Sequence, residues 1–225
     1  MARYKEIFEI WRRDNSLTQA LSASYEMLER TGRMFNASVT ALRQDGSGAI
    51  RASIFEEDQA INRYHQAVRK KVLRHLAITG GINLISGLVL ASIVDDIERI
   101  GDYTKNIAEL AASHNKRLSC GCCEEEIVSI EKAVADVCTR IVPILQSSNQ
   151  VAARRLIGES LWIRKSCDNI VQDLVLEQDE TLIPGNAVVL ALYVRYLKRI
   201  SAHLTNILSS VVNPYERIGY KEDDA

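Results

Sequence analysis

The sequence of 225 residues is long enough for one large or two small domains, and its 47% hydrophobic content can supply a buried core, which excludes a largely disordered chain. Only 3 Pro and 11 Gly interrupt it, and aromatic residues make up 6%, a composition that favours helices over strands. Because the formal net charge is only -1, nucleic acid is not expected as a partner, and any charged partner must be recognised by a local patch.

The N-terminal segment, residues 1–17, is rich in charge and lacks the apolar run of a secretory signal, so a cytoplasmic protein is expected. The one candidate for a membrane span is the uncharged stretch Leu76–Val94. It is interrupted at Thr79–Gly81, which leaves about 13 apolar-leaning residues before Asp95, roughly 20 Å of helix. That length is too short to cross a bilayer, so no transmembrane segment is expected.

Turn signals and apolar periodicity predict three long helices in the N-terminal half. Asp14–Ser16 offers capping oxygens after a short first helix, and breaks are expected at Gln44–Gly48 and Thr79–Gly81. The expected helices are Tyr4–Trp11 paired with Leu17–Leu42, then Ile50–Ile78, then Asn83–Lys116.

A domain boundary is expected at Lys116–Glu124, where Gly121 and three cysteines precede a cluster of glutamates that suits a helix N-terminus. The helices expected beyond it are Glu125–Gln146, Asn149–Glu180 and Asn186–Val212, with Pro184-Gly185 before the last. We therefore predict an all-α fold of six long helices. It comprises a three-helix bundle over 1–118, a second bundle over 119–213 and a flexible tail over 214–225.

An internal repeat supports two similar bundles. A shift of about 100 positions aligns identical residues along the third helix of each half, a period too long for a solenoid. The first copies are Val89, Leu90, Ala91, Val94, Arg99, Ile100, Asn106 and Ile107, and the second are Val189, Leu190, Ala191, Val194, Arg199, Ile200, Asn206 and Ile207.

The third helix of the N-terminal half has an apolar side and an acidic side. At 100° per residue, one face carries Ile93, Ile97, Ile100, Thr104, Ile107 and Ala111. Close to the opposite direction lie Asp95, Glu98, Asp102, Asn106 and Glu109, which we call the acidic stripe. We predict that the apolar side is core.

The acidic stripe is open to two interpretations. Carboxylates one turn apart repel each other, so a hard cation such as iron, manganese, magnesium or calcium would be favoured near Glu98 and Asp102. The alternative is a solvated face whose charge is reduced by Arg99 and Lys105. The corresponding positions of the repeat hold Arg195, Lys198 and Ala202, so a metal site is expected in the first half only.

The run from Asp96 to Glu109 resembles the signature of PhoU domains, whose E(D)-x-x-x-D motif binds metal, and the run from Tyr196 to Ile207 is similar to a second copy without its acids. The resemblance implies two three-helix bundles and a cytoplasmic regulator that restrains phosphate uptake and signalling by contacting a membrane transporter or a sensor histidine kinase. It also implies a divalent or ferric ion, iron, manganese, magnesium or zinc, bound by Glu98 and Asp102, with Asp95, Asp58 and Asn106 as weaker candidates.

Two other functions stay open: a metal-independent adaptor for another ion transporter, and a metal-dependent redox enzyme. The second is not favoured, because no Glu-x-x-His pair, paired histidines or phosphate loop occurs, and no enzymatic activity is expected. A homodimer also stays open, since no sustained heptad seam identifies its contact.

Two charged or reactive segments lie outside the stripe. The basic helix around Arg63–His75 can receive an acidic partner or a phosphate group, although a solvated face explains it as well. The cluster of Cys120, Cys122 and Cys123 can hold a soft metal or respond to redox change, but its spacing matches no structural zinc pattern. Cys138 and Cys167 fall within helices and are expected to be small buried residues.

Overall fold

The structure is a computed structural model that describes residues 15–44, 48–79 and 83–220. Within these ranges the long elements are all α-helices and no strand occurs, which confirms the predicted all-α fold. The helices are α2 (Asn15–Arg43), α3 (Gly48–Thr79), α4 (Leu84–His114), α5 (Glu124–Ser147), α6 (Gln150–Val175) and α7 (Pro184–Val212). Two short 3₁₀ turns, η1 (Gly121–Cys123) and η2 (Tyr215–Arg217), flank the second group of helices.

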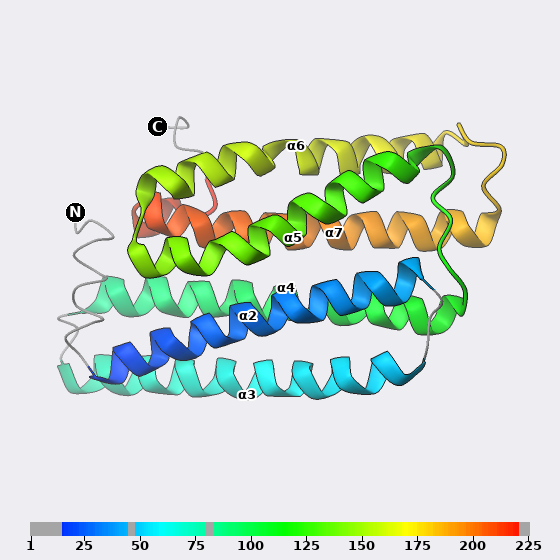
Figure 1. Ribbon diagram of the computed structural model, residues 1–225. Helices are drawn as coiled ribbons and strands as arrows, with labels where there is room; N and C mark the ends of the chain where they lie inside the picture. Colours follow the sequence, from blue (N-terminus) through cyan, green and yellow to red (C-terminus); the bar gives the residue numbers. More distant parts are fainter. Residues whose placement is uncertain (1–14, 45–47, 80–82, 221–225) are drawn as a thin grey trace.

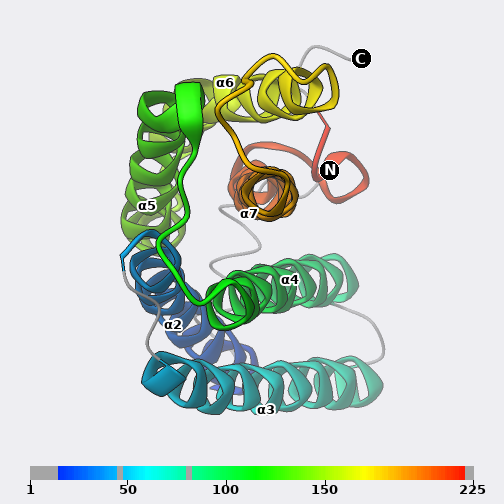
Figure 2. The ribbon, with the colours of Figure 1, turned by 90° about the vertical axis from the view of Figure 1, so that its right-hand side faces the viewer.

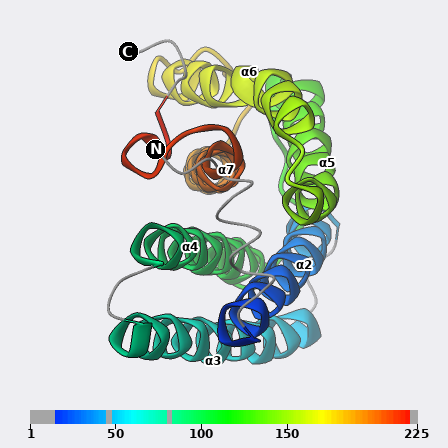
Figure 3. The same cartoon turned by 90° about the vertical axis from the view of Figure 1, so that its left-hand side faces the viewer.

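The helices form two three-helix bundles that lie side by side (Figure 1). In the first, α2, α3 and α4 pack against one another, and in the second α5, α6 and α7 do so. End-on views show α3, α2, α5 and α6 as a curved outer wall, with α4 and α7 facing each other inside it (Figures 2 and 3). The two bundles therefore meet along α4 and α7, and again where α2 contacts α5.

The helix boundaries follow local chemistry. α4 ends at Asn115 and α5 at Ser148, both in the left-handed conformation, and the side chain of Asn149 caps α6 by accepting a hydrogen bond from the backbone N–H of Ala152 at 3.0 Å. None of the described helices is long and apolar enough to cross a membrane.

One predicted helix end is wrong. The helix expected to run to Glu180 ends at Val175, because the chain turns at Glu177, whose φ is 52°. Asp179 then fixes the next loop by accepting hydrogen bonds from the backbone and hydroxyl of Thr181 at 2.9 and 2.6 Å. Sequence periodicity could not reveal this end, since residues 176–180 include no Gly or Pro.

Other predicted segments fall partly or wholly outside the described residues. The short helix Tyr4–Trp11 lies outside them. Residues 214–220 are described and fold back on α7, where the backbone N–H of Gly219 donates to Ser209 Oγ at 2.8 Å. The division into bundles over 1–118 and 119–213 with a flexible tail over 214–225 stays a prediction.

Arg43 joins the two bundles at the end of α2. Its guanidinium donates to the carbonyl of Leu118 at 2.6 Å, pairs with Glu124 and lies 3.1 Å from Glu131 Oε1. The hydroxyl of buried Tyr193 on α7 donates to the same Glu131 oxygen at 2.7 Å. Burial raises the pKa of Glu131 in spite of these partners. One arginine thus connects α2, the interbundle linker and α5.

Candidate metal centre

The apolar side of α4 is buried as predicted. The six side chains expected to form core are at most 3% exposed: Ile93, Ile97, Ile100, Thr104, Ile107 and Ala111. The acidic stripe lies on the side of α4 that meets α3, and its side chains are partly open to solvent. The exposed fractions are 55% for Asp95, 22% for Glu98 and 31% for Asp102.

Glu98 and Asp102, the principal candidates for metal ligands, both lie near the guanidinium of Arg99. Arg99 Nε lies 3.8 Å from Glu98 Oε2, and Arg99 Nη1 lies 3.5 Å from Asp102 Oδ2. Both distances are long for an ion pair, and the arginine side chain is 60% exposed, so these contacts contribute little to stability. Arg99 therefore places positive charge near both carboxylates.

Asp95 meets a histidine that the sequence did not place near it. His65 on α3 has its Nε2 atom 2.7 Å from Asp95 Oδ1, and Arg69 lies 3.6 Å from the same oxygen. His65 is also close enough to Glu98 to lower the pKa of that carboxyl. Because the contact joins α3 to α4, only the packing of the two helices brings this nitrogen ligand to the stripe.

Asp58, a weaker candidate, is held by a lysine. Its Oδ2 atom accepts hydrogen bonds from Lys105 Nζ at 3.1 Å and Asn62 Nδ2 at 3.4 Å, and the residue is only 7% exposed. Burial alone would lower the pKa of Lys105, but the hydrogen bond and charge of Asp58 raise it. Lys105 also lies 3.6 Å from Asp102 Oδ1, so its ammonium bridges the two carboxylates.

Glu98 is the stripe residue whose charge is least well compensated. Partial burial raises its pKa, and the neighbouring carboxylate of Asp102 raises it further, while Arg99 and His65 lower it. A cation at Glu98 would offset both unfavourable effects. Added positive charge near Glu98 would therefore be favourable.

The donor types fit a hard or borderline metal ion, since Glu98, Asp102 and Asp95 offer carboxylate oxygens and His65 offers a nitrogen. As the side chains stand, however, no three His, Cys, Asp or Glu groups among the described residues are arranged to hold a metal ion. Metal binding would require Arg99 to swing away and the carboxylates to converge. The metal site stays a prediction.

The corresponding surface of α7 has a different character. Lys198, in the place of Glu98, pairs with Asp168 of α6. Ala202 and Arg195 replace the two aspartates. Toward α4, His203 Nδ1 lies 2.7 Å from Asp96 Oδ1, and the rings of His203 and Tyr103 stack with centroids 5.8 Å apart. The second copy of the motif therefore serves the contact between the bundles.

The cysteine cluster of the linker does not act as one group. Cys120 is fully buried, and Arg43 Nη1 donates to its sulfur at 3.1 Å. Burial raises the pKa of its thiol to about 12, despite the opposing charge of Arg43. Such a thiol is unreactive. Cys167 is buried in α6 as expected, and Cys138 is half-buried on α5.

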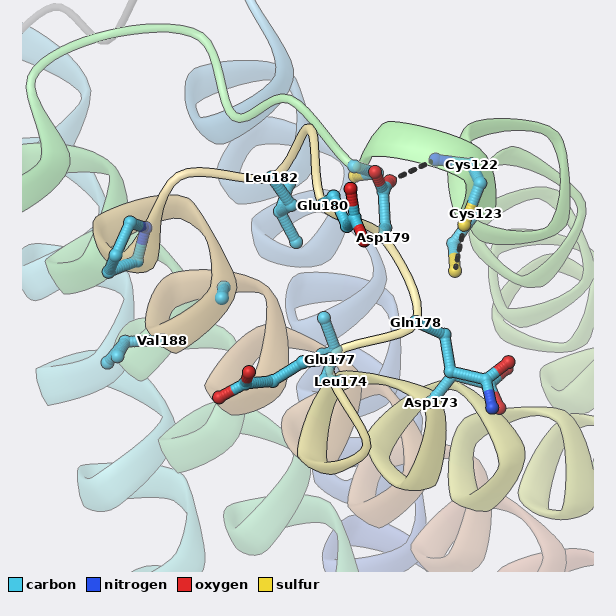
Figure 4. Close-up of a pocket in the computed structure, with 13 residues that line it drawn as sticks. Cys122, Cys123, Asp173, Leu174, Glu177, Gln178, Asp179, Glu180, Leu182 and Val188 are labelled. Carbon is cyan, nitrogen blue, oxygen red and sulfur yellow. Dashed lines mark hydrogen bonds between the residues drawn. The ribbon is translucent and has the colours of Figure 1, made fainter.

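Cys122 and Cys123 border a cavity of about 630 Å³ whose other walls come mainly from the end of α6, the α6–α7 loop and the start of α7 (Figure 4). Their sulfurs are 3.8 Å apart, and the backbone N–H of Cys122 donates to Asp179 Oδ2 at 2.8 Å. Burial, followed by the hydrogen bond with Cys122, raises the pKa of the Cys123 thiol to about 12. The negative charges of Glu126 and Asp173 also raise the pKa of Cys123.

Comparison with known families gives a match within the first bundle. Residues 25–111, which include the acidic stripe, match the family model of the PhoU domain. This part of the chain is therefore similar to the PhoU domain. The matched region runs from α2 to α4, so it covers most of the first bundle.

Two solved structures share the PhoU fold over both bundles. PhoU from Pseudomonas aeruginosa superposes with a TM-score of 0.74 at 20% identity, covering 88% of this chain and 95% of the other. The phosphate transport system regulatory protein PhoU from Streptococcus pneumoniae gives 0.75 at 16% identity, covering 87% and 92%. No curated protein matches the chain. At these identities the likeness is one of fold.

Proposed function

We propose that the chain is a regulator of phosphate uptake and phosphate signalling, a cytoplasmic binding protein without enzymatic activity that contacts a membrane transporter or a sensor histidine kinase. The observation that carries this proposal is the PhoU domain match, which spans the acidic stripe. The likeness to a protein described as a phosphate transport system regulator over 87% of this chain adds support.

The proposed metal site lies on the acidic stripe, with Glu98 and Asp102 as principal ligands and Asp95 as a weaker one. A bound divalent or ferric ion would supply positive charge and relieve the repulsion that raises the pKa of Glu98. His65 would add a nitrogen ligand, which suits iron, manganese or zinc better than magnesium. In this proposal metal binding rigidifies the α3–α4 surface that a partner meets.

The proposed partner surface is the outer face of α3. It exposes four cations: Arg63, Arg69, Lys70 and Arg74. Two apolar side chains on the same helix are also exposed, Leu73 at 70% and Ile78 at 78%. Cations beside exposed apolar groups suit a partner segment that carries acidic and apolar residues.

Capture of the partner from membranes tests both parts of the proposal. The tagged chain would be mixed with detergent-solubilised membranes that contain the phosphate transporter, and retained transporter would be quantified. Glu98→Ala with Asp102→Ala, and separately Lys70→Glu with Arg74→Glu, should each reduce retention by about tenfold or more. Lys132→Glu with Lys165→Glu makes the same charge change on the exposed face of the second bundle and should leave retention unchanged.

The metal-independent adaptor remains a second candidate, because every carboxylate of the proposed metal site already contacts a cation of the protein. It predicts full retention by the Glu98→Ala, Asp102→Ala variant and loss only in the α3 variant. Retention of a potassium or magnesium transporter, with no retention of the phosphate transporter, would assign the chain to another ion.

A further inference from the structure

A second cavity lies on the second bundle, away from the acidic stripe. Its volume is about 310 Å³, and it is bordered by α6, by the C-terminal part of α7 and by the returning segment that ends at Tyr220. A cavity of this size can hold a small organic molecule. Neither the metal proposal nor the partner surface on α3 uses it.

The cavity is electropositive. Two arginines of α6, Arg154 and Arg164, border it, and no aspartate or glutamate is found among its described lining residues. Arg164 is half-buried, and no hydrogen bond or ion pair with any described residue engages its guanidinium. Burial is the only influence that shifts its pKa, and it lowers that pKa. A charge that is half-buried without a partner in the described chain is unfavourable unless a ligand neutralises it.

The other polar groups of the cavity wall are already used within the protein. Thr205 donates to the carbonyl of Ser201 at 2.8 Å, and Ser209 donates to the carbonyl of Asn206 at 2.6 Å. Asn213 Nδ2 donates to two carbonyls of the returning segment, each at 2.9 Å. These bonds hold the wall in place, whereas the guanidinium of Arg164 has no hydrogen-bond partner among the described residues.

The remaining lining is apolar and open. Ile157, Leu161 and Val212 provide aliphatic surface, and Tyr220 provides a ring. At Gly158 on α6, an added Cβ would meet nothing within 4 Å, so this part of the lining leaves open space. An inorganic ion is too small to cover this surface, whereas a molecule with an anionic head and a ring covers both parts.

We propose that this cavity binds a small organic phosphate of about the size of a nucleoside monophosphate. The planar fork of the Arg164 guanidinium donates to the phosphate oxygens, because arginine matches phosphate geometry by paired N–H donors. The aliphatic wall and the Tyr220 ring take the apolar part. The inference is independent of the proposed regulatory function, because it rests on residues of the second bundle alone.

Calorimetric titration of the full chain tests it with matched ligands. The probes are adenosine monophosphate, cytidine monophosphate and glucose 6-phosphate, with adenosine and inorganic phosphate as ligands that each lack one half of the proposed recognition. We expect at least one organic phosphate to bind with a Kd below about 1 mM, and both half-ligands to bind about tenfold more weakly or worse.

Two variants test the site from opposite directions. Arg164→Gln removes the charge and should weaken binding at least about tenfold, while Lys165→Gln removes the neighbouring charge on α6 and should not. Gly158→Leu keeps every polar group but places a side chain in the open space beside Gly158, so it should abolish binding. Gly185→Leu, at another glycine with open space, is its control. Circular dichroism melting confirms that each variant is folded.

Three outcomes would overturn the proposal. One is the absence of binding by all three organic phosphates at 5 mM ligand, roughly five times the expected upper limit of Kd. Another is equal affinity for wild type and the Arg164→Gln variant. The third is binding only after the chain is shortened to end at Tyr220, which would assign the arginines to carboxylates of the chain itself, since Glu222, Asp223 and Asp224 follow in the sequence.

Discussion

Helices α4 and α7 are the third helices of the two bundles, and their sequences repeat each other. Their buried sides share several residue types, whereas their outer sides differ. Ile100 and Ile200 are both fully buried, as are Ile107 and Ile207. On the outer side, Glu98 of α4 corresponds to Lys198 of α7. Packing constrains the buried side of both helices, whereas the outer side was free to diverge. A function that only the first bundle performs should therefore depend on residues on the outer side of α4.

The largest expected effect is on stability, and it tests whether the buried sides of α4 and α7 contribute equally to the free energy of unfolding. Ile100→Ala and Ile200→Ala should each lower the free energy of unfolding by about 2–5 kcal/mol, because both leave a cavity in a packed core. Chemical denaturation measures both. Val151→Ala, at a side chain that is 76% exposed, should change the value by less than about 0.5 kcal/mol. A loss under 1 kcal/mol, roughly the cost of a conservative swap, at either isoleucine would contradict the equivalence of the two cores.

The next effect concerns the connection between the bundles. Arg43→Met should cost about 2–4 kcal/mol, because it leaves the half-buried carboxylate of Glu131 with Tyr193 as its remaining donor. Guanidinium chloride unfolding followed by circular dichroism measures the loss. Arg140→Met, which breaks only the surface pairs with Asp136 and Glu159, should cost less than about 1 kcal/mol. Equal losses of stability in the two variants would show that Arg43 contributes no more than a surface ion pair does.

A matched pair of lysines compares the outer sides directly. Lys105→Met leaves the buried carboxylate of Asp58 without its ammonium donor and should cost about 1–3 kcal/mol. Lys198→Met breaks a pair with Asp168, 60% exposed, and should cost less than about 1 kcal/mol. Thermal unfolding of the two variants at one pH gives the comparison. A larger loss of stability for Lys198→Met than for Lys105→Met would contradict the prediction that the lysine on α4 contributes more than the lysine on α7.

The smallest effect is a pH dependence at Glu98 in metal-free protein. Since its folded-state pKa is raised, mainly by desolvation and then by Asp102, charging this carboxyl costs stability as pH rises from the unfolded pKa, about 4.3, through the folded value. Glu98→Gln should therefore gain stability relative to wild type between about pH 4 and 7, by less than about 1 kcal/mol. Melting temperatures across that range would show the trend, and a relative loss of stability would contradict it.

Most of the fold was predictable because the sequence marks both the helices and the breaks between them. Apolar periodicity and glycine breaks placed α3 and α4 within a few residues, and the repeat indicated two similar bundles. The end of α6 at Val175 was not predictable, because Glu177 adopts a positive φ without the glycine that usually marks it.

The candidate metal site was only half predictable. Spacing along one helix placed Glu98 and Asp102 on the same side, since that relation is local. The approach of His65 to Asp95 and the bridge from Lys105 to Asp58 join α3 to α4, and no spacing within a single helix encodes them. The basic residues of α3 indicated that this helix could pack against acidic residues. Which basic residue meets which acid depends on how α3 and α4 pack, and the sequence alone does not give that alignment.

The metal content of the protein tests the central claim most directly. Metal-free chain would be equilibrated with iron, manganese, zinc and magnesium in turn, and bound metal measured by mass spectrometry after dialysis. Wild type should retain metal, with loss in the Glu98→Ala, Asp102→Ala variant. Metal should stay bound in a variant with Lys198→Ala and Asp168→Ala on the second bundle. Stoichiometric metal retained without Glu98 and Asp102 would contradict the assignment to α4.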